Sequence, residues 1–311
     1  MGTPAFAAPS LRALVGAGHQ VTLAVTPVAR PAGRGRRPTQ PPVAIAAAEL
    51  GIPTYQPDRI RDREPLARIA QEAPEAIVVA AYGQILPSAL LGLPRYGCLN
   101  VHASLLPRHR GASPISAAIL AGDEITGVSI MLMEEELDTG PVLSQAPTPL
   151  QASDDQVSLT ERLADMGAQL LVEALGRWAR GEIQPQAQDE SQATLTRRVT
   201  RADGVLDWKE PAESLWRRVR AYAEWPQGLA TWEGKLLRIL RAGYDEGAIA
   251  DPGVVLAWGP KRHRPVAAAV GTGKGVLLPE VLLLEGRRHM EIDAFLRGYP
   301  SFIGSRLEMT G

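Results

Sequence analysis

Strand-like and helix-like stretches alternate along the first half of the chain, and this alternation restricts the fold more than any other feature. Residues 20–25, 77–81 and 98–101 are short apolar runs typical of buried strands. Residues 42–51 and 62–72 have the composition and spacing typical of helices. Strands that alternate with helices pair in parallel within one sheet. We therefore expect an α/β fold built on a Rossmann-like, mostly parallel sheet.

The second half of the chain carries a different pattern. Short strand-like runs, separated by glycine or proline, follow one another between residues 229 and 284. Such closely spaced short strands suggest a small OB-like β-barrel, a common nucleic-acid-binding module. The polar stretch 184–190 between the two patterns resembles a linker. The predicted division is a first domain at 1–182, a linker at 183–202 and an OB-like domain at 203–311.

Composition excludes several classes of protein. The 311 residues carry a net charge of −1, so nucleic-acid binding would need local basic patches. A single cysteine excludes a disulfide framework, and no His, Asp and Glu cluster has the spacing of metal ligands. No glycine-rich motif for a dinucleotide is present. Because neither a membrane span nor a leader is apparent, we expect a cytoplasmic protein that binds no metal.

The candidate catalytic groups lie in residues 98–107 and in an acidic turn at 137–140. Asn100 and His102, with Val101 between them, lie at the end of a predicted strand. Open α/β sheets bind ligands at this end of their strands. Asp138 in the turn could orient the imidazole or raise its basicity. Without a nucleophilic side chain, this set suits attack by a substrate amine on a carbonyl held by an oxyanion donor. Each residue also fits a plain role in a loop or turn.

Four segments around these residues resemble, in order and spacing, the formyltransferases that use 10-formyltetrahydrofolate. The segments are residues 100–107, 108–115, 126–131 and 137–140. The resemblance is close over residues 2–190 and looser beyond them. It implies that Asn100, His102 and Asp138 are catalytic and that 10-formyltetrahydrofolate is the co-substrate.

The resemblance also implies where the folate binds. The turn after the strand at 77–81 is similar to the folate-side turn of the family, although a plain strand-to-helix turn has the same composition. Its backbone groups could face the pterin ring. The implied folate contacts are Tyr82, Gly83, Gln84, Ile85 and Leu86 in this turn, with Ser104, Leu105, Leu106 and Pro107 after the catalytic strand.

Within the family, the chain most resembles the members that formylate methionyl-tRNA. The arginine-rich loop at 26–38 is similar to an insertion that contacts the tRNA acceptor arm in those members. Between residues 194 and 220, seven basic residues outnumber four acidic ones and could extend this contact. Either stretch could instead be ordinary solvated surface. The implied contacts with the acceptor arm of initiator tRNA are Arg30, Arg34, Arg36, Arg37, Arg197 and Arg198.

The family has an apolar strand immediately before the Gly-Thr-Pro that begins here at Gly2. We therefore expect the first strand of the sheet to be absent, and an incomplete sheet would expose ladder groups. A misassigned start explains this better than a true truncation. A truncated chain could instead be a non-catalytic remnant that binds folate or tRNA.

The expected activity is formyl transfer to the α-amine of initiator methionyl-tRNA, which supports translation initiation. An amino sugar, a purine precursor or water could replace this acceptor. We expect a monomer. We further predict that Cys98 is a buried, inert thiol and that Trp225 and Trp232 are core residues, not stacking platforms.

Overall fold

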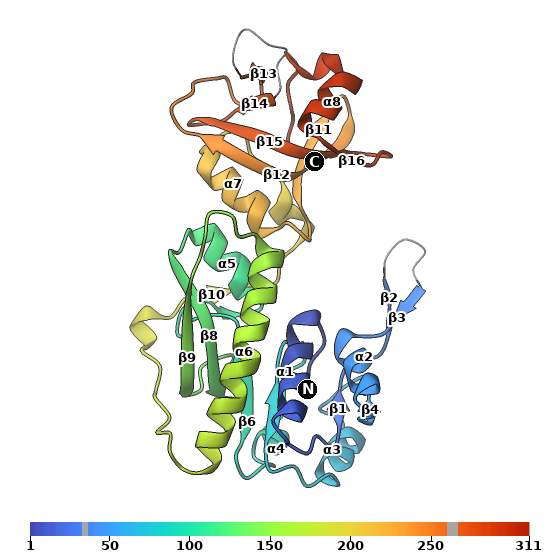
Figure 1. Ribbon diagram of the computed structural model, residues 1–311, viewed down its shortest axis with the longest axis vertical. Helices are drawn as coiled ribbons and strands as arrows, with labels where there is room; N and C mark the ends of the chain where they lie inside the picture. Colours follow the sequence, from blue (N-terminus) through green and yellow to red (C-terminus); the bar gives the residue numbers. More distant parts are fainter. Residues whose placement is uncertain (33–36, 260–266, 311) are drawn as a thin grey trace. The chain divides into compact units, whose positions relative to one another are not determined.

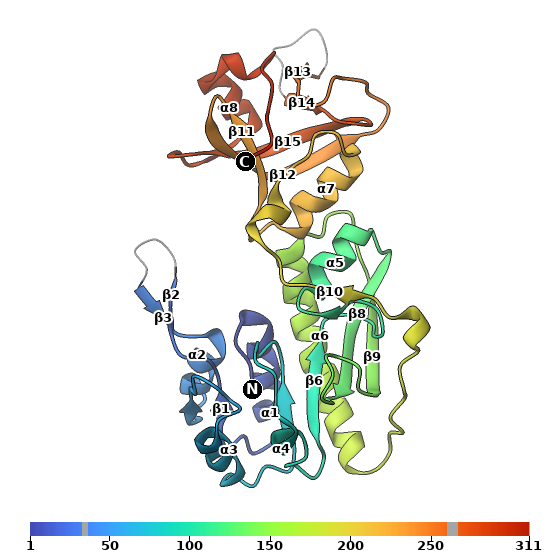
Figure 2. The ribbon, with the colours of Figure 1, turned by 180° about the vertical axis from the view of Figure 1, so that it is seen from behind.

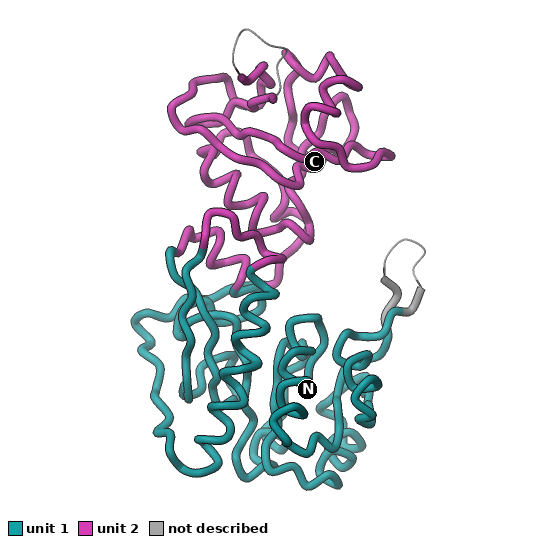
Figure 3. Tube along the Cα trace, viewed as in Figure 1, with its two compact units in different colours: residues 1–114, 124–150, 159–197 teal, residues 115–123, 151–158, 198–311 magenta. Residues whose placement is uncertain are grey.

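The computed structural model describes residues 1–32, 37–259 and 267–310, without the side chains of residues 30–38 (Figure 1). The chain forms two compact units, coloured separately in Figure 3. Unit 1 comprises residues 1–114, 124–150 and 159–197, and unit 2 comprises residues 115–123, 151–158 and 198–311. Each unit has its own sheet and its own buried apolar cluster.

The elements of unit 1 follow the predicted alternation of strands and helices. The strands are β1 (Ala24–Val25), β2 (Arg30–Ala32), β3 (Arg37–Thr39), β4 (Thr54–Tyr55), β5 (Ile77–Val79), β6 (Cys98–His102), β7 (Arg110–Gly111), β8 (Ile125–Leu132), β9 (Val142–Pro149) and β10 (Leu195–Thr196). The helices are α1 (Ala8–Gly16), α2 (Pro42–Glu49), α3 (Arg63–Ala70), α4 (Ser88–Leu91) and most of α6 (Gln156–Ala179), with 3-10 turns at η1 (Ala5–Ala7) and η2 (Glu190–Gln192).

A mostly parallel sheet organises unit 1, as predicted. β5 pairs in parallel with β6, β8 runs antiparallel to β6, and β9 runs antiparallel to β8. β1 and β4 form a further parallel pair. Gly2 bridges Ala80 in parallel, and its amide donates to the Val25 carbonyl at 3.1 Å. The first residues therefore link β1 to β5, at the place where we expected a strand to be absent.

Helix α6 covers one face of the sheet formed by β6, β8 and β9 (Figures 1 and 2). Four of its leucines are buried, and Leu159, Leu163 and Leu171 among them are fully shielded from solvent. Gly167 allows the close approach, because a Cβ there would lie 2.8 Å from a methyl group of Val101 on β6. Val101 therefore faces α6, whereas Asn100 and His102 lie on the opposite face of β6, and all five residues of the strand are buried.

Unit 2 is built on an antiparallel sheet. Its strands are β11 (Gly228–Trp232), β12 (Lys235–Asp245), β13 (Val255–Trp258), β14 (Ala267–Gly271), β15 (Val276–Leu284) and β16 (His289–Glu291). Its helices are α5 (Pro114–Ala121) apart from the first residue, α7 (Ala212–Ala221) and α8 (Ile292–Gly298), with 3-10 turns at η3 (Arg201–Gly204) and η4 (Pro300–Phe302). The strand order is β11-β12-β15-β14-β13, and β16 pairs with β15.

The predicted barrel is not closed by direct strand pairing between its two edge strands, β11 and β13, in the described part of the chain. Residues 304–308 hydrogen-bond to both edges instead. Thr231 of β11 exchanges two backbone bonds with Glu308, at 2.8 and 2.9 Å. Val255 of β13 receives a bond from Gly304 at 2.8 Å and donates one to Ser305 at 2.9 Å. The terminal segment thus satisfies groups that an open edge would leave unpaired.

The two tryptophans predicted to be core residues differ in their exposure. Trp232 is 2% exposed and packs against Phe295 and Phe302, with ring centroids 5.8 and 5.3 Å away. Trp225 is 56% exposed, so the prediction was wrong for this residue. It lies in the turn between α7 and β11, where it packs on no other ring among the described residues. No described helix is long and apolar enough to cross a membrane.

Candidate active site

Strand β6 and the turn between β8 and β9 bring together the three predicted catalytic side chains. Asn100 and His102 lie two residues apart and so share a face of β6. The Asn100 amide nitrogen donates to Asp138 Oδ1 at 3.2 Å, and His102 Nδ1 lies 3.7 Å from Asp138 Oδ2. Each residue is at most 9% exposed. An amide, an imidazole and a carboxylate therefore meet in one shielded place.

The His102 ring contacts a protein oxygen through each nitrogen. Nε2 lies 3.0 Å from the carbonyl oxygen of His109. Since a carbonyl only accepts hydrogen bonds, Nε2 carries a proton in this arrangement. Nδ1 therefore remains the position at which the ring can gain or lose a proton, and the Asp138 carboxylate faces it at 3.7 Å. The geometry suits proton exchange with a reacting group beside Asp138.

The Asp138 loop is held by residues that we did not predict. The Gly111 amide donates to Asp138 Oδ2 at 2.8 Å. The Gln188 side-chain amide donates to the carbonyls of Asp138 and Gly140, at 2.8 and 2.7 Å. Asp138 itself has a φ of 57°, a conformation that such external bonds help to maintain.

Gln188 is in turn fixed by Arg110, which is 3% exposed. Arg110 Nε donates to Gln188 Oε1 at 2.9 Å, and its guanidinium pairs with both Glu190 oxygens at 2.9 and 2.7 Å. Hydrogen bonding to Glu190 raises the pKa of Arg110 and lowers that of Glu190. Residues 188–190 thus pack onto unit 1, although their polar composition resembles a linker. The one signal in the sequence was that the family resemblance continues to residue 190.

The turn implied to bind folate is divided between core and surface. Tyr82 and Leu86 are 3% and 4% exposed and belong to the apolar cluster around β5, and burial raises the pKa of Tyr82 to about 12. Gln84 accepts a bond from the Ile60 amide at 2.9 Å. Ile85, in contrast, is 81% exposed. Gly83 has a φ of 83°, which glycine adopts without strain.

The second implied folate segment, residues 104–107, is tightly bonded to the sheet. Ser104 is fully buried, and its hydroxyl donates to the Arg108 carbonyl at 2.6 Å. The Ser129 hydroxyl donates to the Ser104 carbonyl at 2.6 Å and accepts from the Leu106 amide at 3.0 Å. Leu105 and Pro107 are the partly exposed members of the segment. These bonds hold the loop beside β6.

The residues implied to bind tRNA are only partly described. Arg34 and Arg36 lie outside the described residues, and the side chains of Arg30 and Arg37 are not described either. The backbones of Arg30 and Arg37 belong to β2 and β3, which pair antiparallel. Arg197 and Arg198 are exposed.

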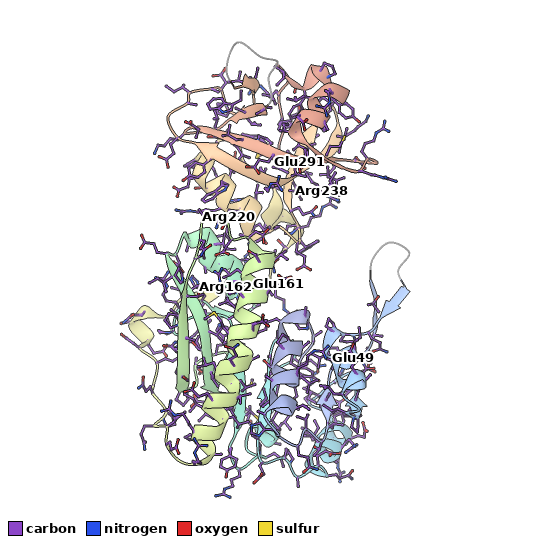
Figure 4. The ribbon with its side chains drawn as sticks, viewed as in Figure 1. Glu49, Glu161, Arg162, Arg220, Arg238 and Glu291 are labelled. Atoms are coloured by element: carbon purple, nitrogen blue, oxygen red, sulfur yellow. The ribbon has the colours of Figure 1, made fainter. Side chains whose placement is uncertain are left out.

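Several cations of the basic stretch 194–220 are engaged within unit 2. Arg217 pairs with Glu213, and Arg218 pairs with Glu210 at 2.8 Å. Arg220, labelled in Figure 4, donates to the carbonyls of residues 151 and 154, and its guanidinium carbon lies 4.1 Å from the Trp216 ring centroid. These three arginines therefore have structural partners, which limits their availability to a nucleic acid.

Two protein families match the chain. Residues 1–175 match the Formyl transferase family, and residues 198–300 match the family described as Formyl transferase, C-terminal domain. The two matches cover nearly all of both patterns recognised in the sequence.

Curated relatives match along almost the whole chain. The methionyl-tRNA formyltransferase of Citrifermentans bemidjiense is 42% identical over 299 residues, which are 96% of this chain and 92% of the relative. The methionyl-tRNA formyltransferase of Chloroflexus aurantiacus is 43% identical over 302 residues, which are 96% of this chain and 95% of the relative.

Solved structures share the fold. An N-formyltransferase from Helicobacter canadensis, in complex with folinic acid and dTDP-3-aminofucose, superposes with a TM-score of 0.63 at 15% identity, covering 89% of this chain and 96% of its own. HypX from Aquifex aeolicus, in complex with tetrahydrofolic acid, gives 0.57 at 21% identity, covering 82% and 43%. At these identities the likeness concerns the fold alone.

Proposed function

The chain belongs to the formyl transferase family, and we propose that it transfers a formyl group from 10-formyltetrahydrofolate to the α-amine of methionyl-tRNA. The main support for this chemistry is that the side chains of Asn100, His102 and Asp138 lie close together in one buried place. Near-full-length similarity to relatives named methionyl-tRNA formyltransferase supports the acceptor. The reaction supplies formylated initiator tRNA for translation.

Asn100 would stabilise the charge that develops on the formyl oxygen. One amide proton of Asn100 is directed to Asp138 Oδ1, and the second is left for an oxyanion. As the uncharged amine attacks the formyl carbon, its carbonyl oxygen becomes negative, and a fixed donor at that oxygen is worth roughly 3 kcal/mol. Asp138 keeps the amide oriented toward this task.

His102 and Asp138 would accept and donate the protons that move during the reaction. Attack by the α-amine leaves an excess proton on the attacking nitrogen, and the Asp138 carboxylate is placed to accept it through a water or through His102 Nδ1. When the bond to N10 of the folate breaks, that nitrogen needs a proton, which a protonated His102 can return. The chain's own groups thus balance the transfer without a covalent enzyme intermediate.

We further propose that unit 1 carries catalysis and that unit 2 contributes to tRNA binding. Residues 82–86 and 104–107 would line the folate site, and the loop at 26–38 would contact the acceptor arm. The deep burial of Tyr82 favours a role for its backbone rather than its side chain at the folate site. A cytoplasmic location and a monomeric state remain predictions.

The experiment compares formyl transfer to methionyl-tRNA by the wild type and by His102→Ala. We expect kcat to fall by about 100-fold or more, because a proton carrier and a charge-stabilising group are lost together. The KM for methionyl-tRNA should change little. His289→Ala is the matched control, since His289 is exposed on β16. Undiminished turnover by His102→Ala would contradict the assignment, and equal formylation of an amino sugar would contradict the acceptor.

A further inference from the structure

Unit 2 holds a pocket of about 380 Å³ that the sequence did not indicate. Its wall includes two arginines, a tryptophan and an amide side chain. The lining residues used below are Arg201, Glu224, Trp225, Gln227 and Arg238, with Leu236 as an apolar side. They come from η3, from the turn between α7 and β11, and from β12, on which Figure 4 labels Arg238. Ligand pockets begin at about 300 Å³, so this one has room for a single small group.

Trp225 gives the pocket an aromatic wall. At 56% exposure it differs from Trp208 and Trp232, which are 4% and 2% exposed in the same unit. Among the described residues, Trp225 makes none of the ring or cation contacts that engage Trp216 and Trp232. A large flat ring left open beside a pocket is suited to stacking on a ligand with a π-face.

Arg201 and Arg238 give the pocket its charge. Arg218 and Arg241 of the same unit are paired: Arg218 contacts Glu210 at 2.8 Å, and Arg241 contacts Glu280 at 2.6 Å and Glu291 at 3.1 Å. Within the described chain, no hydrogen bond or ion pair engages the guanidinium of Arg201 or Arg238. Glu224 is the one acid of the lining, so cationic charge exceeds anionic charge. Guanidinium groups without partners favour a phosphate.

We propose that this pocket holds one unpaired nucleotide of the RNA substrate. The base stacks on Trp225, the adjoining phosphate pairs with Arg201 and Arg238, and the Gln227 amide offers a donor and an acceptor. The volume fits one nucleotide and excludes a base-paired stem. This proposal rests on the proposed function for the identity of the RNA, while the pocket and its chemistry stand on the contacts above.

The binding test uses the full chain labelled with fluorotryptophan and observed by fluorine NMR. The chain has six tryptophans, and the resonance missing from Trp225→Phe assigns Trp225. A short single-stranded RNA should shift this resonance, and the shift should be lost in the double variant Arg201→Ala/Arg238→Ala. A resonance unmoved by the RNA overturns the proposal, as does a response to inorganic phosphate with none to RNA.

The kinetic test measures formyl transfer to methionyl-tRNA. Trp225→Ala should raise the KM for the RNA on the order of tenfold, as expected for one lost stacking contact, with kcat unchanged. Trp225→Phe keeps a ring and should retain most of the affinity. Lys235→Ala is the matched control, because Lys235 is an exposed cation of β12 outside the pocket lining. A wild-type KM in Trp225→Ala overturns the proposal.

The two tests separate this proposal from the proposed function. If RNA shifts the Trp225 resonance but the protein does not formylate methionyl-tRNA, the proposed function is contradicted and the proposed role of the pocket is not. Normal formylation by Trp225→Ala, together with a wild-type Trp225 resonance that RNA does not shift, would overturn the proposed role of the pocket. The proposed function would then be unaffected.

We infer, from independent contacts in unit 1, that Gln188 is a positioning residue for Asp138. Its amide bonds the carbonyls on both sides of the Asp138 turn, at 2.8 and 2.7 Å. Arg110 holds the other end of the same side chain at 2.9 Å. Gln188 thus fixes where the Asp138 carboxylate stands relative to His102, although it does not touch the carboxylate itself.

Gln188→Ala should lower kcat and leave the KM values for both substrates near wild type, since the carboxylate loses its orientation and the substrates lose no contact. Gln188→Glu should behave like the alanine variant, because a carboxylate cannot donate to the two carbonyls. Gln186→Ala is the matched control: Gln186 exchanges backbone bonds with Val142, and its side chain is exposed. A kcat equal to that of Gln186→Ala overturns the inference.

Discussion

The Asp138 carboxylate owes its position to residues that are far from it in the sequence. Its two oxygens receive bonds from Asn100 and from the Gly111 amide, at 3.2 and 2.8 Å. Gly111 has a φ of 107°, and a Cβ there would lie 2.3 Å from the Thr196 carbonyl oxygen, so only glycine brings the amide to this place. The identity of the acid was predictable from its motif, whereas its supports were not.

The reactivity of Cys98 tests whether β6 is buried. Cys98 is 1% exposed, and burial raises the pKa of its thiol to about 12. We expect the folded protein to resist alkylation by iodoacetamide at mildly alkaline pH and to react after unfolding in denaturant. Because the chain has one cysteine, the label reports this site alone. Fast alkylation of the folded protein would contradict the buried position of β6.

The raised pKa of the Cys98 thiol also makes the stability of the folded protein depend on pH. The folded state holds the thiol proton more tightly than the unfolded state, whose pKa is near 9.0. This contribution to the free energy of unfolding is therefore fully present below about pH 9 and is lost as the pH rises toward 12. Tyr82 acts in the same direction at alkaline pH. Denaturant titrations should show a smaller alkaline loss in Cys98→Ala than in the wild type.

At the scale of elements, β2 and β3 pair within the arginine-rich segment 26–38, which we propose contacts the tRNA. Arg34→Ala should raise the KM for methionyl-tRNA and reduce the salt dependence of binding by about one phosphate contact. Arg61→Ala is the matched control, since Arg61 is an exposed cation outside the loop. Steady-state kinetics at several salt concentrations would provide the measurement. Unchanged tRNA kinetics in Arg34→Ala would refute the role of the loop.

The presence of strands was easier to predict from the sequence than the residues at which they begin and end. Residues 276–278 and 281–284 are two of the short strand-like runs in the sequence, with Pro279 between them, yet β15 runs through from Val276 to Leu284. Pro279 pairs with Ala242 where β12 has register shifts on both sides of Arg241. Such irregularities tolerate a residue without an amide proton. The bulge is a property of the partner strand, so the local sequence around Pro279 could not reveal it.

At the scale of the whole molecule, both predicted patterns became compact units. The alternation of strand-like and helix-like segments predicted the α/β sheet, and closely spaced strand-like runs predicted a β-rich second unit, because local composition decides which elements form. The contacts of residues 304–308 could not be predicted from local sequence. Their role in joining β11 to β13 depends on two edges that lie far away in the chain, as the bonds of Thr231 with Glu308 and of Val255 with Gly304 show.

The sequence by itself determined the order of the elements, the family and the identity of the three catalytic candidates, because each follows from local composition or from a contiguous motif. Only the tertiary structure decided that residues 188–190 support Asp138, that Trp225 is exposed beside two arginines without partners, and that residues 304–308 join both sheet edges. These features depend on contacts between distant segments, and packing and hydrogen bonding choose such partners only once the chain has folded.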